Sequence, residues 1–146
     1  MTSASSLFHG IVSGERRRDH ADVAARAARI AGGLQKLGVK PGDCVCILMR
    51  NDIAFIEAAY AAMMLGAYAV PINWHFKPDE VAYILGDTGT QVLIGHADLL
   101  HPLEGHVPSG VTVLSASTPP EIRASYTIDP ASLDALPGAI DLETWL

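Results

Sequence analysis

Three groups of residues in this sequence have side chains that can do chemistry. They are His75 in "NWHF", the pair Cys44 and Cys46 in "CVCIL", and the histidines His96, His101 and His106, which follow at intervals of five. A histidine can act as a general acid or base near neutral pH, a cysteine pair can form a disulfide, and several such residues together can bind zinc. The spacing and the neighbours of each group decide between these roles and a structural one.

The cysteines and the spaced histidines do not predict a metal site. On a strand, side chains two residues apart point to the same face about 6.5 Å apart, which is a poor geometry for a disulfide. We therefore expect Cys44 and Cys46 to be reduced thiols that are buried as small hydrophobic groups. A spacing of five scatters side chains around a helix, so the three histidines do not form a zinc site.

The turn that contains His75 is expected to be structural. No acid or nucleophile is spaced to work with this histidine, which predicts a turn residue at the surface or against Trp74 rather than a general base. Trp74 and Phe76 are expected to pin the turn against the core, the alternative being that they stack on a base or grip a ligand. Pro71 ends the preceding strand because it cannot donate to a sheet, and Asn73 suits a turn closed by its own side chain.

Composition and charge exclude several classes of protein. The chain has 146 residues, of which 49% are apolar, so we expect one domain with one core. The net charge is −6, and the run Arg16 to Arg18 is too small for a nucleic-acid surface; we read it as a solvated turn. No apolar run reaches the ~20 residues of a membrane span, and residues 1–8 lack a secretory signal pattern, so the cytoplasm is the expected location.

An amphipathic helix is predicted over residues 22–38. Its apolar positions recur at spacings of three and four: Val23, Ala27, Ile30, Leu34 and Leu37. Gly32 and Gly33 lie inside this helix, where we expect another segment of backbone to pack closely against them.

Strands and helices then alternate along the chain. Strands are predicted over 44–49, 67–70, 90–95 and 111–116, and helices over 53–65, 77–89 and, more weakly, 97–105. Asn51 or Asp52 can cap the first of these helices, and Pro78 suits the first turn of the second. The pattern predicts an α/β fold with a mostly parallel sheet of about four strands and covering helices; the alternative is an antiparallel α+β domain.

The chain divides into three parts on this interpretation. They are an N-terminal segment (1–20), an α/β subdomain (21–116) and a loop-rich tail (117–146) that leads towards a missing remainder. The helix over 53–65 has one charged residue, Glu57, so we expect it to be covered on more than one side. In the isolated chain it is expected to expose an apolar patch that drives self-association.

Residues Asp22 to Ile94 resemble the N-terminal part of the adenylate-forming superfamily, the acyl-CoA synthetases and their relatives. Five features match in order: the turn "GVKPGD", an asparagine in "RND", an alanine-rich helix, the block "LGAYAVPIN" and the helix "KPDEVAYILGDTG". The "NWHF" variant is more similar to fatty-acyl and aryl-acid synthetases than to peptide-synthetase modules. The resemblance implies that the chain is a piece of the large N-terminal domain of that fold.

Members of this superfamily join a carboxylic acid to a thiol, usually coenzyme A, through an acyl-adenylate formed from ATP with Mg²⁺. The resemblance therefore implies ATP, Mg²⁺ and CoA for the full-length enzyme, and none of them for this chain. The segment "SASTPP", Ser115 to Pro120, is the only stretch remotely similar to the family's phosphate loop, and it has no glycine and no lysine. We expect no catalytic, cofactor-binding or metal-binding residue here; these should come after Leu146.

Two hypotheses follow. The first is that the chain is the N-terminal portion of an acyl-CoA synthetase, such as one of fatty acid metabolism, present either as a fragment or as a truncated gene product, and inactive by itself. The second is a self-standing, non-enzymatic α/β module for binding or regulation that is derived from such an enzyme. The sequence does not indicate which carboxylic acid is the substrate, nor the oligomeric state.

Overall fold

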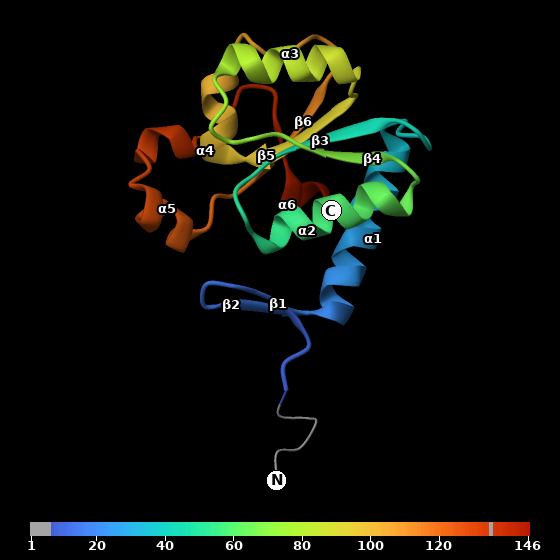
Figure 1. The fold of residues 1–146 in the computed structure, drawn as a ribbon, viewed down its shortest axis with the longest axis vertical. Coiled ribbons are helices and arrows are strands. Elements are labelled where there is room, and N and C mark those ends of the chain that lie inside the picture. Colours follow the sequence, from blue (N-terminus) through green and yellow to red (C-terminus); the bar gives the residue numbers. More distant parts are fainter. Residues whose placement is uncertain (1–6, 135) are drawn as a thin grey trace.

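The computed structural model describes residues 7–134 and 136–146 as a hairpin followed by alternating strands and helices (Figure 1). The strands are β1 (Gly10–Ser13), β2 (Arg16–Asp19), β3 (Cys44–Leu48), β4 (Tyr68–Pro71), β5 (Val92–His96), β6 (Thr112–Ala116) and β7 (Ile140–Asp141). The α-helices are α1 (His20–Lys36), α2 (Ile53–Met64), α3 (Pro78–Thr88), α4 (Ala97–Leu100), α5 (Pro120–Tyr126) and α6 (Leu142–Trp145). Two 3₁₀ helices are η2 (His101–Leu103) and η3 (Pro130–Leu133).

The main sheet is parallel and has the strand order β4-β3-β5-β6-β7. In the centre, Cys46 is in register with Val70 on one side and with Leu93 on the other. The prediction of a parallel α/β sheet is confirmed, and β7 adds a fifth strand to the four that were expected. Pro71 is the last residue of the edge strand β4, where its missing N–H costs no ladder bond on the paired side.

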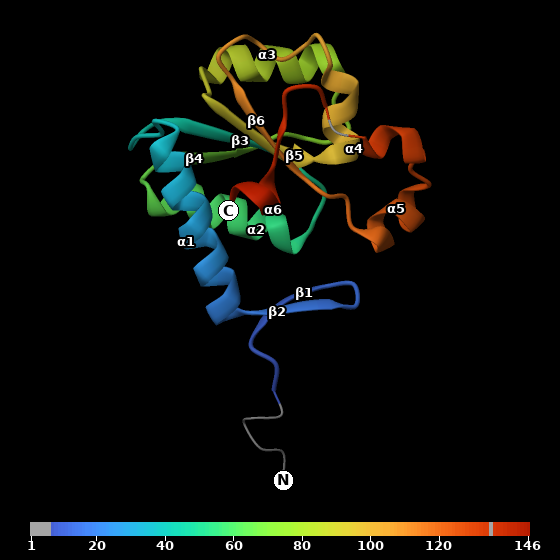
Figure 2. The ribbon, with the colours of Figure 1, turned by 180° about the vertical axis from the view of Figure 1, so that it is seen from behind.

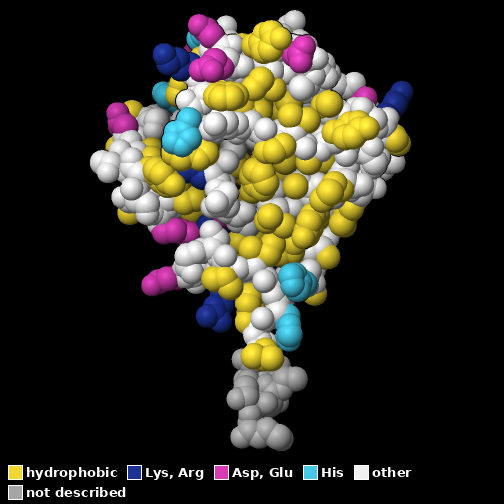
Figure 3. Space-filling model, viewed as in Figure 1, with side chains coloured by type: hydrophobic (Ala, Val, Ile, Leu, Met, Phe, Trp, Pro, Cys, Tyr) yellow, Lys and Arg dark blue, Asp and Glu magenta, His cyan; other side chains and the backbone are white. Residues whose placement is uncertain are grey.

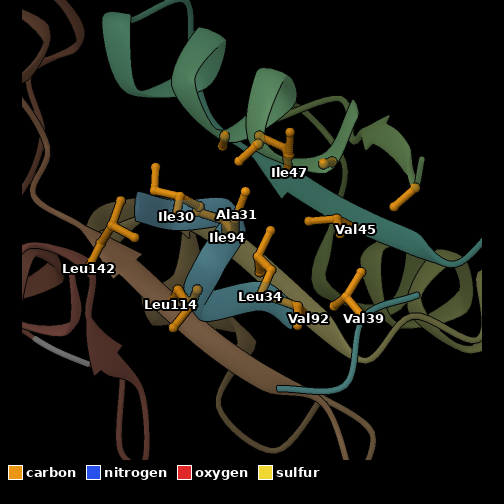
Figure 4. Close-up of a cluster of buried hydrophobic side chains, with 14 of the residues drawn as sticks. Ile30, Ala31, Leu34, Val39, Val45, Ile47, Val92, Ile94, Leu114 and Leu142 are labelled. Atoms are coloured by element: carbon orange, nitrogen blue, oxygen red, sulfur yellow. The ribbon is translucent and has the colours of Figure 1, made fainter. Parts of the chain in front are cut away.

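Helices cover both faces of the sheet (Figures 1 and 2). On one face, α1, α2 and α6 enclose a core that includes Ile30, Ile47 and Ile94 (Figure 4). On the other face, α3 and the segment α4–η2 pack on the side chains that alternate with these along the strands, such as Leu48 and Leu93. Strands buried on both faces carry continuous apolar runs, which is why β3 and β5 show no polar alternation.

The helix α1 forms because its apolar stripe meets the sheet. Val23, Ala27, Ile30 and Leu34 are all buried, as the spacing predicted. A Cβ on Gly33 would lie 2.3 Å from the Trp145 ring, so this ring leaves no room for a larger side chain at position 33. The close neighbour is therefore a side chain and not the backbone that was expected. The expectation was wrong for Gly32, because a Cβ at that position would meet no atom within 4 Å.

The helix α2 has one covered and one open side. Ile53, Glu57 and the alanines at 58, 61 and 62 are buried against α1 and the sheet. On the open side, Tyr60, Met63 and Met64 are exposed, and Tyr68 of the edge strand β4 extends the same surface. Figure 3 shows hydrophobic side chains gathered over this part of the molecule. We call these four residues the α2–β4 patch.

Two segments are more ordered than the sequence pattern indicated. The run Arg16 to Arg18 was wrongly read as a solvated turn: it forms β2, which pairs with β1 in a hairpin. The stretch 117–146 was expected to be mostly loop, but it contains α5, η3, β7 and α6. These elements are two to seven residues long and carry no readable period, so their few buried residues, such as Ile122 and Leu142, anchor them.

Among residues 7–134 and 136–146, no helix is both long enough and apolar enough to cross a membrane.

Candidate functional site

The carboxyl edge of the sheet between β3 and β5 is the place where this topology puts polar residues together. From β3 the chain passes through α2 to β4, and it then returns through α3 to β5 on the opposite side of β3. Open α/β sheets with this strand order bind ligands outside the carboxyl ends of the strands at such a reversal. His96 is the last residue of β5, Asp98 follows it, and Arg50 and Asp52 follow β3. All four are buried.

Asp52 is the centre of the first group. It is the N-cap residue of α2, as the sequence suggested, and its Oδ1 accepts the backbone N–H of Ile53 at 2.7 Å. The same oxygen also accepts a hydrogen bond from Arg16, which reaches over from the hairpin and also pairs with Glu121 of α5. The other oxygen, Oδ2, lies 2.9 Å from Nε2 of His96. One carboxylate therefore joins the hairpin, α2 and the end of β5.

The partners of His96 define its tautomer. The backbone N–H of Arg50 donates to Nδ1 of His96 at 3.3 Å, so the ring proton lies on Nε2 and is donated to Asp52. Burial by itself raises the pKa of Asp52, but the hydrogen bonds from His96 and Arg16 outweigh burial, so this pKa lies below its ordinary value. The Arg16 pKa is raised, because its carboxylate partners outweigh burial, which acts in the opposite direction.

Arg50 is the centre of the second group. Its Nη1 donates to Oδ2 of Asp98 at 2.8 Å, and Oδ1 of Asp98 accepts the Thr118 hydroxyl at 2.7 Å. The guanidinium carbon of Arg50 lies 4.6 Å from the centre of the Trp74 ring and 4.7 Å from that of Tyr126. Stacking of this kind suits the planar guanidinium. The contacts join the ends of β3, β5 and β6 to the "NWHF" turn and to α5.

A third ionic group ties the hairpin to the helices. Glu57 of α2 is 1% exposed at its side chain, and both of its oxygens accept hydrogen bonds from Nη1 of Arg18 at 2.8 Å. Nε of Arg26 in α1 lies 3.2 Å from Oε1 of Glu57, and the same arginine pairs with Glu143, the second residue of α6. The one charge on α2 is thus neutralised inside the molecule, which leaves the α2–β4 patch without charge.

The acids and the base at this edge of the sheet are shielded from solvent. The His96 side chain is fully buried, and the side chains of Asp52 and Asp98 are 3% and 5% exposed. A general base must lie within hydrogen-bond reach of the proton that it removes. The arrangement therefore joins the hairpin, the turn after β4 and the segment after β6.

The residues singled out from sequence lie apart. His75 is exposed and stacks on Trp74 with 3.7 Å between ring centres, as expected for a turn residue. The backbone N–H of His75 donates to Oδ1 of Asn73. Phe76 is 39% exposed, so it pins the turn less fully than Trp74 does. Pro78 begins α3, as expected.

The cysteines and the other histidines are not brought together either. Cys44 and Cys46 are free thiols on β3; Cys46 is buried as expected, whereas Cys44 is only half-buried. Burial raises the pKa of Cys46. His101 is half-buried on η2, and His106 is exposed with its Nε2 3.4 Å from Asp79. The part of the chain that the structure describes contains no group of three or more His, Cys, Asp or Glu residues that could hold a metal ion.

Sequence reasoning missed the roles of Arg50, His96 and Asp98. His96 was noted only for its spacing from the later histidines, which plays no part in the structure. The available signal was that polar residues directly follow two strands, because the carboxyl ends of parallel strands meet at one edge.

The segment from Ser115 to Pro120 does not fit the phosphates of a nucleoside triphosphate with Mg²⁺. The segment from Ser115 to Pro120 carries β6 into α5, where Pro119 and Pro120 provide no N–H groups. The carboxylate of Asp98 holds the Thr118 hydroxyl and is itself a like charge to phosphate. Phosphate sites require several N–H donors or cations around the phosphate oxygens. We therefore assign no step of ATP chemistry to this chain.

Comparison with known proteins identifies the class. The fold matches the crystal structure of the anthranilate CoA ligase AuaEII in complex with anthranoyl-AMP, with a TM-score of 0.75 and 25% identity over 94% of this chain and 24% of that one. The fold is thus part of the N-terminal domain of an adenylate-forming enzyme. Residues 6–138 match the family of AMP-binding enzymes, and the chain belongs to this family.

Curated relatives are CoA ligases that are much longer than this chain. A feruloyl-CoA synthase of Amycolatopsis sp is 34% identical over 110 residues, which are 70% of this chain and 22% of that protein. A long-chain-fatty-acid–CoA ligase of Mycobacterium tuberculosis is 44% identical over 78 residues, which are 53% of this chain and 16% of that protein. The chain therefore spans about a fifth of the length of these relatives.

Proposed function

We propose that this chain is the N-terminal part of an acyl-CoA synthetase. The full-length enzyme would join a carboxylic acid to CoA, with formation of an acyl-adenylate and pyrophosphate from ATP, followed by displacement of AMP by the thiol. The observation that carries this proposal is the match of residues 6–138 to the AMP-binding family together with relatives that are CoA ligases. We expect this enzyme to work in the cytoplasm, with an aryl or fatty acid as substrate.

Within that enzyme, we assign the described residues a structural role without catalytic, cofactor-binding or metal-binding residues. The polar groups at the carboxyl edge of the sheet support this assignment because they bond to one another and are shielded from solvent. Their partners come from the hairpin, the turn after β4 and α5, so they hold these segments in fixed positions.

Pyrophosphate exchange tests the proposal. Full-length protein and the 146-residue chain are each incubated with ATP, Mg²⁺, labelled pyrophosphate and a panel of fatty and aryl acids. We expect acid-dependent exchange into ATP from the long form and none from residues 1–146. Exchange catalysed by the short chain would contradict the structural role, and a long form inert with every acid would contradict the enzymatic assignment.

The α2–β4 patch supports a second part of the proposal, which is that the isolated chain self-associates. Tyr60, Met63, Met64 and Tyr68 are between 44% and 66% exposed and lie on adjacent elements. Contiguous apolar surface of this kind drives association. Sedimentation velocity should show dimers or larger species, and Met63→Glu should shift them towards monomer. A stable monomer that binds no hydrophobic dye would contradict this part.

The alternative is a self-standing binding or regulatory module. One observation favours it: the described residues form a five-stranded sheet whose central strands are covered on both faces. A reading frame that stops naturally after Leu146 would support the module, whereas a frame that continues into a Ser/Thr/Gly-rich loop and a later lysine would support the synthetase.

A further inference from the structure

We propose that the carboxyl ends of β5, β6 and β7 form a binding site for a small carboxylate that also carries a hydroxyl or ammonium group. A cavity of about 270 Å³ lies there, lined by Ala97, Ser115, Ser117, Thr118, Arg123, Leu133 and Asp141. Since a water molecule takes about 30 Å³ of liquid volume, this space holds a compound of a few carbon atoms. The proposed function assigns no ligand to these residues, so this site goes beyond it.

Arg123 provides the positive charge of this cavity. It is an exposed residue of α5, and its side chain has no ion pair or hydrogen bond with the residues that the structure describes. The neighbouring arginines differ: Arg16 pairs with Asp52 and Glu121, and Arg50 pairs with Asp98. A guanidinium binds a carboxylate through two parallel hydrogen bonds, so an unpaired arginine in a cavity favours this partner.

Two hydroxyl groups add further donors and acceptors. Ser115 is the fourth residue of β6 and is buried, while Ser117 follows the strand and is exposed. Neither hydroxyl has a hydrogen-bond partner within residues 7–134 and 136–146, and both serines are among the residues that line the cavity. Thr118 is different, because its hydroxyl is already held by Asp98. Ligand sites typically combine a few such convergent polar groups with an apolar wall, here Leu133.

Asp141 narrows the class of ligand. Its Oδ2 accepts the backbone N–H of Thr144 at 3.0 Å, and Asp141 is also one of the residues that line the cavity. A phosphate or a dicarboxylate would bring extra negative charge towards it, which is unfavourable. A ligand with one carboxylate for Arg123 and one donor group for Asp141 matches both walls. Hydroxy acids and amino acids of three or four carbons have this chemistry.

Nuclear magnetic resonance of the ¹⁵N-labelled 146-residue chain tests the site with L-lactate, L-serine, acetate and inorganic phosphate. We expect saturable shifts at the amides of Ala97, Ser115 and Ser117 with lactate or serine, and weaker binding of acetate and phosphate. Arg123→Gln should weaken binding about tenfold or more, since it removes a charge-assisted contact. Arg29→Gln is the matched control, because Arg29 is exposed on α1 away from the cavity.

Asp141→Asn should reduce the ratio of the affinities for lactate and serine to the affinity for acetate. If Asp141 had only a structural role, this ratio would not change. The proposal fails if no probe gives saturable shifts, if phosphate binds more tightly than both preferred probes, or if Arg123→Gln binds like the parent chain. If Arg123→Gln does not fold, Ser117→Ala replaces it, because Ser117 is exposed and its substitution should leave the fold intact. We expect weaker binding from Ser117→Ala. Unchanged binding would contradict the site. None of these outcomes depends on pyrophosphate exchange.

Discussion

The substitution Asp52→Asn tests whether the buried group around this residue holds the edge of the sheet together. The new side-chain amide keeps one oxygen, which can still accept from Ile53 and Arg16 at the position of Oδ1. Its NH₂ group then faces Nε2 of His96, which is also a donor. The histidine cannot change tautomer without cost, because the backbone N–H of Arg50 already donates to Nδ1.

The expected cost of this substitution is about 3 kcal/mol of unfolding free energy. It combines a lost hydrogen bond to a charged group, about 1.5–3 kcal/mol, with a buried donor that has no acceptor, about 1–3 kcal/mol. In urea, with a slope of about 2 kcal/mol per M, the midpoint should fall by about 1.5 M. The assay is urea unfolding followed by far-ultraviolet circular dichroism. Asp87→Asn, at an exposed residue of α3, is the control.

The difference between parent and variant should also depend on pH. Because the folded pKa of Asp52 is depressed, its carboxylate stabilises the fold above the unfolded pKa of about 4, and this contribution is lost as the pH falls through the folded pKa. The gap should therefore be constant above about pH 5 and shrink below about pH 4. A gap under about 0.5 kcal/mol at pH 7, or one that widens in acid, would refute the reasoning.

Three further substitutions test the backbone and the packing by thermal unfolding. Gly95→Ala should cost about 1–3 kcal/mol, because the new Cβ would lie 2.9 Å from the carbonyl oxygen of Leu48 and 2.7 Å from Leu100. Gly86→Ala, inside α3 with open space around it, should instead stabilise the protein by up to about 1 kcal/mol. Thr127→Gly should stabilise by about 1 kcal/mol, since Thr127 has φ +50°, where a β-branched residue is strained; an unchanged midpoint would contradict this.

Much of the fold could be read from local pattern. The spacing of Val23, Ala27, Ile30 and Leu34 predicts that one side of α1 packs against the sheet. The continuous apolar runs of β3 and β5 predict strands that are covered on both faces. Both properties can be read from short stretches of sequence. The same stretches carried the resemblance to the adenylate-forming enzymes, which the family match confirms. These features depend on interactions between residues that are close in the chain.

Only the tertiary structure decided which polar groups meet. Arg16 and Asp52 are 36 residues apart in the chain, and Asp52 and His96 are 44 residues apart. They come together because parallel strands end at one edge of the sheet and the hairpin folds over this edge. The short elements after residue 117 were equally hidden, since pieces of two to seven residues have no period and persist through long-range contacts. Local sequence encodes the direction of a side chain along its own helix or strand, whereas the choice of its distant partner follows from the packing of the whole chain.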